Sequence, residues 1–590
     1  MSHFFSKTTF ISLLITIFII GGAALCWLAW HETQTIDEGV HISAGYSYLK
    51  TGDYRLNPEH PPLAKQIAAL PILFLKPTLP TNTEAWDTAD QWQFAQEFLY
   101  KSGNNSQLIL FLGRLPIIFL TILLGVCIAR WAYELGGKIS SLVATILYFS
   151  SPVILTHGHL ITTDVPVALG VFATAYFFTK ALRSPKKLWI FLTAFAYAFA
   201  IDVKFTGVIL VVFIPLIYWI VSYYCTSRFT HLKFSHFIKL FSAMIIFGAL
   251  LAFITTGCQT LKSVDDPFLG THHIQLATEF IGKLPENTHW AINTYLWILN
   301  NVTFPGYPYV TGLFEFMTHF ESGHESYFLG TYTDFGNIWY FPVAILIKTR
   351  LAVMVLLSLI LTLFVKQSFW VWKFKLQKKS FLKKITEWLK TFNPESFVLF
   401  LIPTIFFLSA LQSKVNIGVR HILLVYPFMF IGISMLWSIQ IKKRRVFIGI
   451  ITSILGIAIL STIMIWPFPM AYFSEAVGGA SQGYKYMLDS NLDWGQNLPY
   501  VKEYLTKNKI NTICLGYFGQ GHFSSETISV KPLYDDATIK KHEPINCVVV
   551  ISAQMLYNRD NTFTWLKKLQ PTEVIGYGLY VYDLRTNATR

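Results

Sequence analysis

Charged residues are scarce in this chain. Asp, Glu, Lys and Arg make up only 14% of its 590 residues, against about 25% in a typical soluble domain. The sequence is also 53% hydrophobic and 16% aromatic. This composition excludes an ordinary soluble globular protein and indicates a chain that lies largely within a membrane.

Several motifs are missing as well. The six cysteines show no metal-ligand spacing. The C-terminal part has neither a Gly-rich phosphate loop nor a dinucleotide-binding fingerprint, so nothing marks it as nucleotide-binding. No internal repeat of the kind that secondary transporters carry is visible. Cys514 and Cys547 fall on two predicted strands, and the sequence leaves open whether they form a disulfide.

Long apolar runs dominate instead. The first, residues 10–30, is longer than the apolar core of a signal peptide and carries Trp27 and Trp30 as interfacial anchors, which favours a retained helix. Ten more runs lie near 108–132, 139–156, 164–182, 188–203, 205–224, 238–258, 341–365, 396–412, 421–440 and 446–469. The length of about 30 Å that a helix must cross therefore predicts about eleven spans.

Positive charge is concentrated in four clusters. The net charge is +14, and the basic residues gather in 180–187, 227–239, 366–384 and 442–445. With about eleven spans, all four clusters fall on one side, which the positive-inside rule assigns to the cytoplasm. We therefore expect a multi-pass protein of the plasma or inner membrane, with a cytoplasmic N-terminus and an extracytoplasmic C-terminal domain. The positive charge then reflects topology, and no nucleic-acid partner is expected.

Two parts of the chain differ in pattern. Residues 1–469 are predicted to form the membrane domain, interrupted by external loops over 31–106 and about 259–340. Residues 470–590 contain strand-like runs bounded by turn residues, with helical spacing between them. We expect a small α/β domain outside the membrane.

Ionisable residues of several separate segments all fall on the outer side. Such residues at membrane depth are costly and are functional candidates by default. They are Asp37, Glu38, Glu59 and His60 in the first external loop, then His157, His159, Asp164, Lys204, Arg420 and His421 at the outer ends of spans.

These residue types suit one kind of chemistry. A carboxylate can serve as a general base, whereas Lys and Arg bind phosphate. A base beside a phosphate clamp at the outer leaflet fits a lipid-phosphate-linked donor, whose departing phosphate the cations would stabilise.

Each residue also has a purely structural interpretation. Asp37 and Glu38 fit a solvated helix start, Asp164 fits a helix N-cap, and Lys204 fits a snorkelling side chain. His157 and His159 fit polar interface residues, or else a metal site.

Four short motifs give the chain a family resemblance. They are the acidic pair Asp37-Glu38 after the first span, HPPLAK (60–65), TTDVP (162–166) and AIDVKFTG (200–207). Their order and spacing resemble those of GT-C fold glycosyltransferases that use polyprenyl-phosphate sugars, such as the protein O-mannosyltransferases and the aminoarabinose transferases. NIGVRH (416–421) and GGASQGYKYMLDSNLDWGQNL (478–498) resemble segments of bacterial phospholipid-carrier-dependent members.

The resemblance implies a role for each residue. Asp37 would be the catalytic base, and Glu38 would orient the acceptor or the sugar. Glu59 and His60 would line the donor site, and Asp164 and Lys204 would lie near the lipid phosphate. The position of Glu59 touches a metal in the aminoarabinose transferases. A divalent metal at Glu59, His157 and His159 therefore stays open here, although no cofactor is expected to be required.

We therefore expect an inverting membrane glycosyltransferase. It would move a hexosyl or pentosyl group from a polyprenyl-phosphate donor to a hydroxyl of a protein, lipid or polysaccharide. Lys204 and Arg420 would stabilise the departing phosphate, with His421 beside them. The alternative is a transporter or flippase of lipid-linked sugars, but the polar groups gather at one face and not at the midplane.

Overall fold

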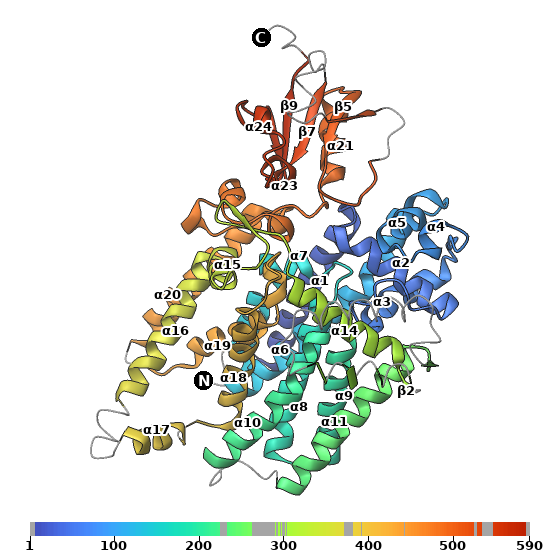
Figure 1. Ribbon diagram of the computed structural model, residues 1–590. Helices are drawn as coiled ribbons and strands as arrows, with labels where there is room; N and C mark the ends of the chain where they lie inside the picture. Colours follow the sequence, from blue (N-terminus) through green and yellow to red (C-terminus); the bar gives the residue numbers. More distant parts are fainter. Residues whose placement is uncertain are drawn as a thin grey trace.

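The computed structural model describes residues 6–224, 233–261, 289–290, 293–294, 297, 301, 304–370, 381–390, 392–441, 443–523, 528–533 and 547–585. Helices dominate this part of the chain up to residue 465, and a small sheet follows (Figure 1). Most of the predicted external loop 259–340 before residue 304 lies outside the described residues.

The protein spans a membrane several times. Within the described ranges, seven helices are long and apolar enough to cross it, or eight if the bent pair Lys383–Leu389 and Pro394–Ala410 counts as one span. The seven are Lys7–His31 (α1), Ser106–Phe149 (α6), Asp164–Arg183 (α8), Phe205–Tyr224 (η3 with α10, Leu210–Tyr224), Phe234–Thr255 (α11), Leu351–Trp370 (α16) and Arg444–Ile465 (α20). The predicted helical membrane architecture is confirmed, but the count of eleven spans is not.

The count differs because two predicted runs fall within one helix, α6, and because the runs 188–203, 396–412 and 421–440 form helices shorter than a span. Runs 108–132 and 139–156 meet in α6, which is interrupted at Gly137 with φ 77°. Glycine adopts that conformation without the steric cost a side chain would bring. Run 341–365 is divided into α15 (Tyr340–Lys348) and α16 by Thr349, whose backbone is extended.

Other elements are shorter than a span. They are α2 (Ile36–Thr51), α3 (Pro62–Ala69), α4 (Glu84–Asp87), α5 (Gln91–Gln96), α7 (Pro152–His157), α9 (Lys187–Val203), α14 (Tyr307–Ser322), α17 (Phe381–Leu389), α18 (Pro394–Ala410) and α19 (Val425–Ser434). Two strand pairs accompany them, β1 (Thr260–Leu261) with β2 (Phe304–Pro305) and β3 (Ser326–Phe328) with β4 (Thr331–Thr333).

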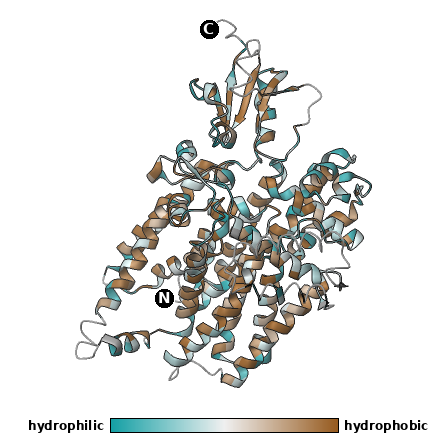
Figure 2. Ribbon diagram, in the orientation of Figure 1, coloured by the Kyte–Doolittle hydropathy of each residue, from teal (hydrophilic) through white to brown (hydrophobic). Residues whose placement is uncertain are grey.

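Burial separates the central helix from the peripheral ones. The most apolar window of α8 is 89% buried, whereas those of α1 and α16 are 17% buried. The long helices carry apolar side chains along their length (Figure 2). Exposed apolar faces of this extent are typical of contact with lipid. The helix that carries Asp164 is therefore enclosed by protein.

The predicted loop 31–106 folds into short helices. Within it, the segment HPPLAKQIAALPILF forms α3 and the 3₁₀ turn η1 (Leu70–Phe74), as expected for a short amphipathic helix. Gly45 of α2 lets this segment approach closely, because a Cβ there would lie 2.2 Å from the carbonyl oxygen of Lys65.

The predicted C-terminal α/β domain is confirmed by a five-stranded sheet of order β6-β5-β7-β9-β8. Its strands are β5 (Thr512–Gly516), β6 (Ser529–Pro532), β7 (Val548–Ser552), β8 (Glu573–Ile575) and β9 (Leu579–Asp583), with α21 (Leu498–Lys507), α23 (Ala553–Leu556) and α24 (Thr564–Lys567) around it. The strands β6, β5 and β7 are parallel. A disulfide joins Cys514 to Cys547.

The sheet stands at one end of the helical part, whereas α17 and the free ends of α10 and α11 lie at the other (Figure 1). The connection from α20 to the sheet packs into the membrane part. Lys348 at the end of α15 donates hydrogen bonds to the carbonyl oxygens of Met470 and Asn491, at 2.8 and 2.6 Å, and also to that of Tyr472. Buried Lys348 thus anchors the segment that precedes the sheet.

Candidate active site

The acidic pair occupies the first turn of α2. Thr35 is the N-cap and Glu38 the third helical residue, and together they form a capping box in which the Thr35 backbone N–H donates to Glu38 Oε2 at 2.9 Å. Asp37 and Glu38 are neighbours in the chain, so their side chains leave the helix in different directions. The two carboxylates consequently have different surroundings.

Glu38 is fully buried against Arg114 of α6. Arg114 donates from Nε to Oε1 at 2.8 Å and from Nη2 to Oε2 at 2.6 Å, and the Ile161 N–H donates to Oε1 at 3.0 Å. Burial would raise the pKa of Glu38, but the charge and hydrogen bonds of Arg114 hold it below its usual value. Glu38 therefore braces α2 against α6 and does not line the cavity beside Asp37.

Asp37 faces a cavity and pairs with Arg420. Arg420 Nη1 donates to Asp37 Oδ2 at 2.7 Å, and the guanidinium carbon lies 4.1 Å from the centroid of the Trp494 ring. The Asp37 side chain remains 22% exposed. An aromatic face under a guanidinium both attracts and orients it. Asp37 is thus held at the cavity wall with one oxygen engaged.

Asp164 is the first residue of α8. The N-cap residue is Thr163, so the structural interpretation of Asp164 as the N-cap is wrong. Lys204 Nζ donates to Asp164 Oδ1 at 2.6 Å, and Arg420 Nη1 lies 3.8 Å from Oδ2. The Lys204 residue is 8% exposed and pairs inside the protein, so it does not snorkel to an interface. Two carboxylates and two cations thereby form one continuous array in the cavity wall.

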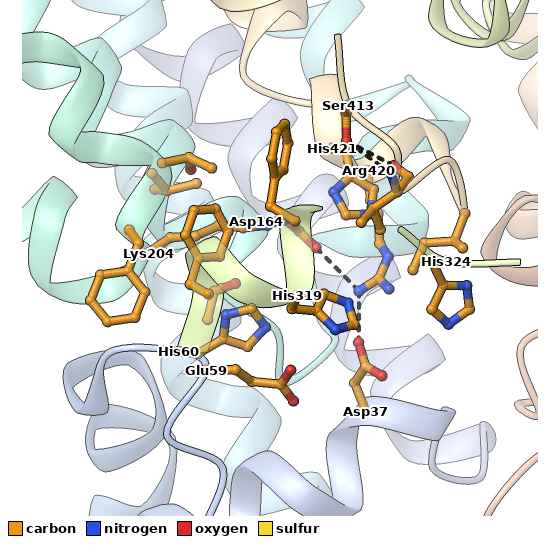
Figure 3. A pocket seen from close by; sticks show the side chains of 18 of the residues that line it. Asp37, Glu59, His60, Asp164, Lys204, His319, His324, Ser413, Arg420 and His421 are labelled. Carbon is orange, nitrogen blue, oxygen red and sulfur yellow. Dashed lines mark hydrogen bonds and ion pairs between the residues drawn. The ribbon is translucent and has the colours of Figure 1, made fainter. Parts of the chain in front are cut away.

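Glu59 and His60 lie on the opposite side of the cavity from Arg420 (Figure 3). Asn57 Nδ2 donates to Glu59 Oε1 at 3.1 Å. Burial raises the pKa of Glu59, while His319 opposes the shift. Burial also lowers the pKa of His60 well below its usual value, which favours a neutral ring.

Lys65 holds the turn that carries this pair. Its Nζ donates to the carbonyl oxygens of Asn57 and His60, at 2.6 and 2.8 Å, and to Tyr48 Oη at 3.0 Å. Burial lowers the Lys65 pKa to about 7. The lysine of the HPPLAK motif therefore acts within the protein, by fixing the backbone of residues 57–60.

The remaining histidines separate into two groups. His421 lines the cavity. His159 is buried away from it, between Glu32 Oε2 at 3.0 Å and the Leu155 carbonyl oxygen at 2.9 Å. His157 is buried and does not line the cavity. In the described part of the chain, no three His, Cys, Asp or Glu residues are grouped to hold a metal ion, so His157, His159 and Glu59 do not form a joint site.

The cavity has a volume of about 740 Å³, which is in the range of small-molecule sites. Its walls carry polar atoms that are buried yet have no hydrogen-bond partner among the described residues: His60 Nδ1, Asp164 Oδ2, Arg420 Nε and His421 Nε2. Buried polar atoms are normally satisfied. Their concentration around one cavity therefore points to a polar ligand at this place.

The cavity walls differ in polarity. Apolar side chains of η3, α14, α18 and the chain near α19 belong to its lining, among them Val208, Leu313, Phe316, Phe406 and Leu424. The Asp37–Arg420 pair lies between Lys204 on one side and His324 on the other (Figure 3). The site can thus hold a molecule with an apolar portion and an anionic portion next to a carboxylate.

Several residues that line or support the site were not predicted from the sequence. Arg114 has a detectable signal, because it is an arginine inside the apolar run 108–132. Trp494 and Asp489 lie within the quoted GGASQGYKYMLDSNLDWGQNL segment, but no periodicity or motif spacing points to the cavity that they line. His319 and His324 belong to the second external loop and have no sequence signal of their own.

The class defined by this fold and site is a multi-span membrane protein with a buried carboxylate–cation array. Residues 103–255 match the family described as dolichyl-phosphate-mannose-protein mannosyltransferase. That stretch contains Arg114, Asp164 and Lys204. The match confirms the resemblance to the GT-C glycosyltransferases over this part of the chain.

Alignments with two solved structures cover nearly the whole chain. ArnT from Cupriavidus metallidurans bound to undecaprenyl phosphate is 10% identical, covering 99% of this chain and 100% of that one with a TM-score of 0.42. The same protein in the apo state is 12% identical, covering 96% and 97% with a TM-score of 0.28. No curated protein sequence gives a match.

Proposed function

We propose that the protein transfers a sugar from a polyprenyl-phosphate donor to an acceptor hydroxyl at the outer face of the membrane. The observation that carries this proposal is the Asp37–Arg420–Asp164–Lys204 array in a cavity that is apolar on one side. A polyprenyl chain suits the apolar side, and its phosphate suits Lys204 and the unsatisfied Arg420 Nε. The family match over residues 103–255 supports the same donor class.

The transfer itself is a single displacement. Asp37 accepts the proton of the acceptor hydroxyl, and the oxygen forms a bond to the anomeric carbon on the face opposite the phosphate. The bond between that carbon and the phosphate oxygen breaks, and its electron pair leaves with the polyprenyl phosphate. Lys204 and Arg420 stabilise the charge that develops there. Attack from the opposite face inverts the anomeric centre.

Donor binding has a consequence for the base. Arg420 Nη1 is engaged by Asp37 at 2.7 Å. A phosphate that recruits the same guanidinium would loosen this ion pair and free an Asp37 oxygen for the acceptor proton. Both oxygens of the base would then become available only when a donor is bound.

The orientation in the membrane belongs to this proposal. The ends of α10 and α11, next to the basic cluster 227–239, lie away from the C-terminal sheet, as does α17 (Figure 1). The positive-inside rule then makes those ends cytoplasmic and the sheet extracytoplasmic.

Native mass spectrometry of the purified protein tests the function. We expect the wild type to carry polyprenyl phosphate, its product, and Asp37→Asn to carry the sugar-bearing lipid that it cannot turn over. If the protein were a transporter, the wild type and Asp37→Asn would both carry the intact sugar-bearing lipid. Absence of any polyprenyl lipid, or the same sugar-bearing lipid on both proteins, contradicts the proposal.

A further inference from the structure

The segment 486–497 forms a fixed wall of the cavity. Asp489 and Trp494 line it. Asn491 donates from Nδ2 to Tyr340 Oη at 3.0 Å, and its Oδ1 accepts from the Val419 N–H at 3.0 Å. Because Val419 immediately precedes Arg420, this hydrogen bond links the wall to the turn that carries Arg420.

The carboxyl ends of two strands of the C-terminal sheet face the same wall. The strands β5 and β7 are parallel, and their carboxyl ends lead to Phe518 and Gln554, both of which line the cavity. The Phe518 N–H donates to Ser552 Oγ at 3.0 Å, and the Asp489 N–H donates to Gln554 Oε1 at 3.1 Å. Ligands of open α/β sheets bind at the carboxyl ends of strands, where loops can present side chains without breaking the sheet.

This part of the wall differs chemically from the lipid-compatible part. It offers the carboxylates of Asp489 and Glu325, the amide of Gln554 and the aromatic ring of Phe518. Arg559 lies 3.6 Å from Glu325 and 2.8 Å from Asp334, and Arg420 engages Asp37 through Nη1. The negative charge of Asp489 and Glu325 disfavours an anionic ligand, whereas carboxylate and amide groups beside an aromatic face bind hydroxyls over a nonpolar ring surface.

We propose that Phe518, Gln554 and Asp489 form the acceptor subsite, and that the acceptor bound there is an uncharged, hydroxyl-rich sugar residue. This inference rests on the proposed transferase function and adds the substrate class of its second site. Asp37 lines the same cavity as these three residues, so a hydroxyl held by the C-terminal domain can reach the proposed base. The α/β domain then serves to select the acceptor.

Photo-crosslinking in intact cells tests the assignment with two matched substitutions. One full-length variant carries Phe518→p-azidophenylalanine, and the other carries Phe316→p-azidophenylalanine on the apolar side of the cavity. Mass spectrometry then identifies the adduct at each position. We expect carbohydrate at position 518 and polyprenyl lipid at position 316.

The adducts at positions 518 and 316 distinguish a wrong acceptor subsite from a wrong donor. Polyprenyl lipid at 316 with only a peptide adduct, or no adduct, at 518 overturns the sugar subsite and leaves the transferase function standing. Carbohydrate at 518 without polyprenyl lipid at 316 contradicts the donor and leaves the subsite standing. Neither adduct overturns both.

A second crosslinking position keeps the test valid if the Phe518 variant does not fold. Placing p-azidophenylalanine at Gln554 must capture the same carbohydrate as at position 518. In addition, Gln554→Ala in the Phe518 variant removes a hydrogen-bonding amide and is expected to lower the carbohydrate adduct about tenfold. The lipid adduct at position 316 should not change. Equal loss at both positions, or no loss at 518, contradicts a role for Gln554 in binding the acceptor.

Discussion

Arg420 Nη1 lies 2.7 Å from Asp37 Oδ2, although 383 residues separate the two along the chain. One side chain comes from the first turn of α2 and the other from the 3₁₀ turn η7 (Val419–Ile422). The guanidinium carbon of Arg420 lies 4.1 Å from the centroid of the Trp494 ring. The pair joins the proposed base to the proposed phosphate clamp.

Replacing Arg420 should weaken both donor binding and transfer. Arg420→Lys keeps the charge but loses the planar fork and the stacking on Trp494, so we expect an intermediate loss. Arg420→Ala should lower the transfer rate by about 10²–10³, as loss of a transition-state donor does elsewhere. The measurement is donor Kd by titration together with the rate of sugar transfer.

Arg559→Ala is the matched control for Arg420. Arg559 also forms an ion pair, with Asp334, but its side chain is 49% exposed. Exposed pairs contribute about 0–1 kcal/mol, so we expect near-normal donor binding. If Arg420→Ala bound donor as tightly as Arg559→Ala does, the phosphate role of Arg420 would be wrong.

Glu38 and Arg114 should act on stability and not on substrate binding. Both side chains are fully buried. Removing one partner of a buried pair leaves an uncompensated charge and costs about 3–5 kcal/mol. We therefore expect Glu38→Gln and Arg114→Met each to lower the Tm in detergent strongly, and the double variant to be more stable than the sum of the single losses predicts.

Asp53→Asn provides the comparison for that series, because the Asp53–Arg55 pair is partly exposed. Its Tm should stay close to that of the wild type. A Glu38→Gln protein with wild-type Tm, full donor binding and no transfer would show instead that Glu38 contacts a substrate.

Asp493 gives the protein a pH-dependent stability. It is 2% exposed, and burial raises its pKa to about 7, although the Gly495 N–H and Asn497 oppose the shift. The folded state therefore keeps a proton that the unfolded chain releases above about pH 3.9. This contribution is present at low pH and is lost as pH rises toward 7.

Thermal unfolding between pH 5 and 8 checks this assignment. Asp493→Asn retains an uncharged hydrogen-bond acceptor of the same shape, so its Tm should fall less than that of the wild type over this range. Parallel Tm curves for the two proteins would exclude Asp493 as the titrating group.

The sequence predicted the helical membrane architecture because hydrocarbon thickness sets the length of apolar runs. It could not count the spans, because two predicted runs meet within α6 at the kink of Gly137, and because runs such as 188–203 and 421–440 form helices shorter than a span. The placement of Asp37, Asp164, Lys204 and Arg420 on one side was an inference from alternating spans, and the structure brings these four into one array.

Other parts of the site were beyond the sequence. Glu38 is buried and Asp37 faces the cavity because Arg114 of α6 binds the Glu38 carboxylate. Trp494 lies in the connection between α20 and the sheet, Gln554 lies in α23, and both line the cavity with residues from distant parts of the chain. Contacts between segments this far apart leave no local pattern, since neither periodicity nor turn chemistry depends on them.

The rate of sugar transfer by Asp37→Asn, measured beside its donor Kd, tests the central claim most directly. Asparagine preserves the shape of the side chain but cannot accept the hydroxyl proton. We predict a loss of at least about 10²-fold in rate, with donor binding within a few-fold of the wild type. A folded Asp37→Asn protein that transfers sugar at the wild-type rate would contradict the account.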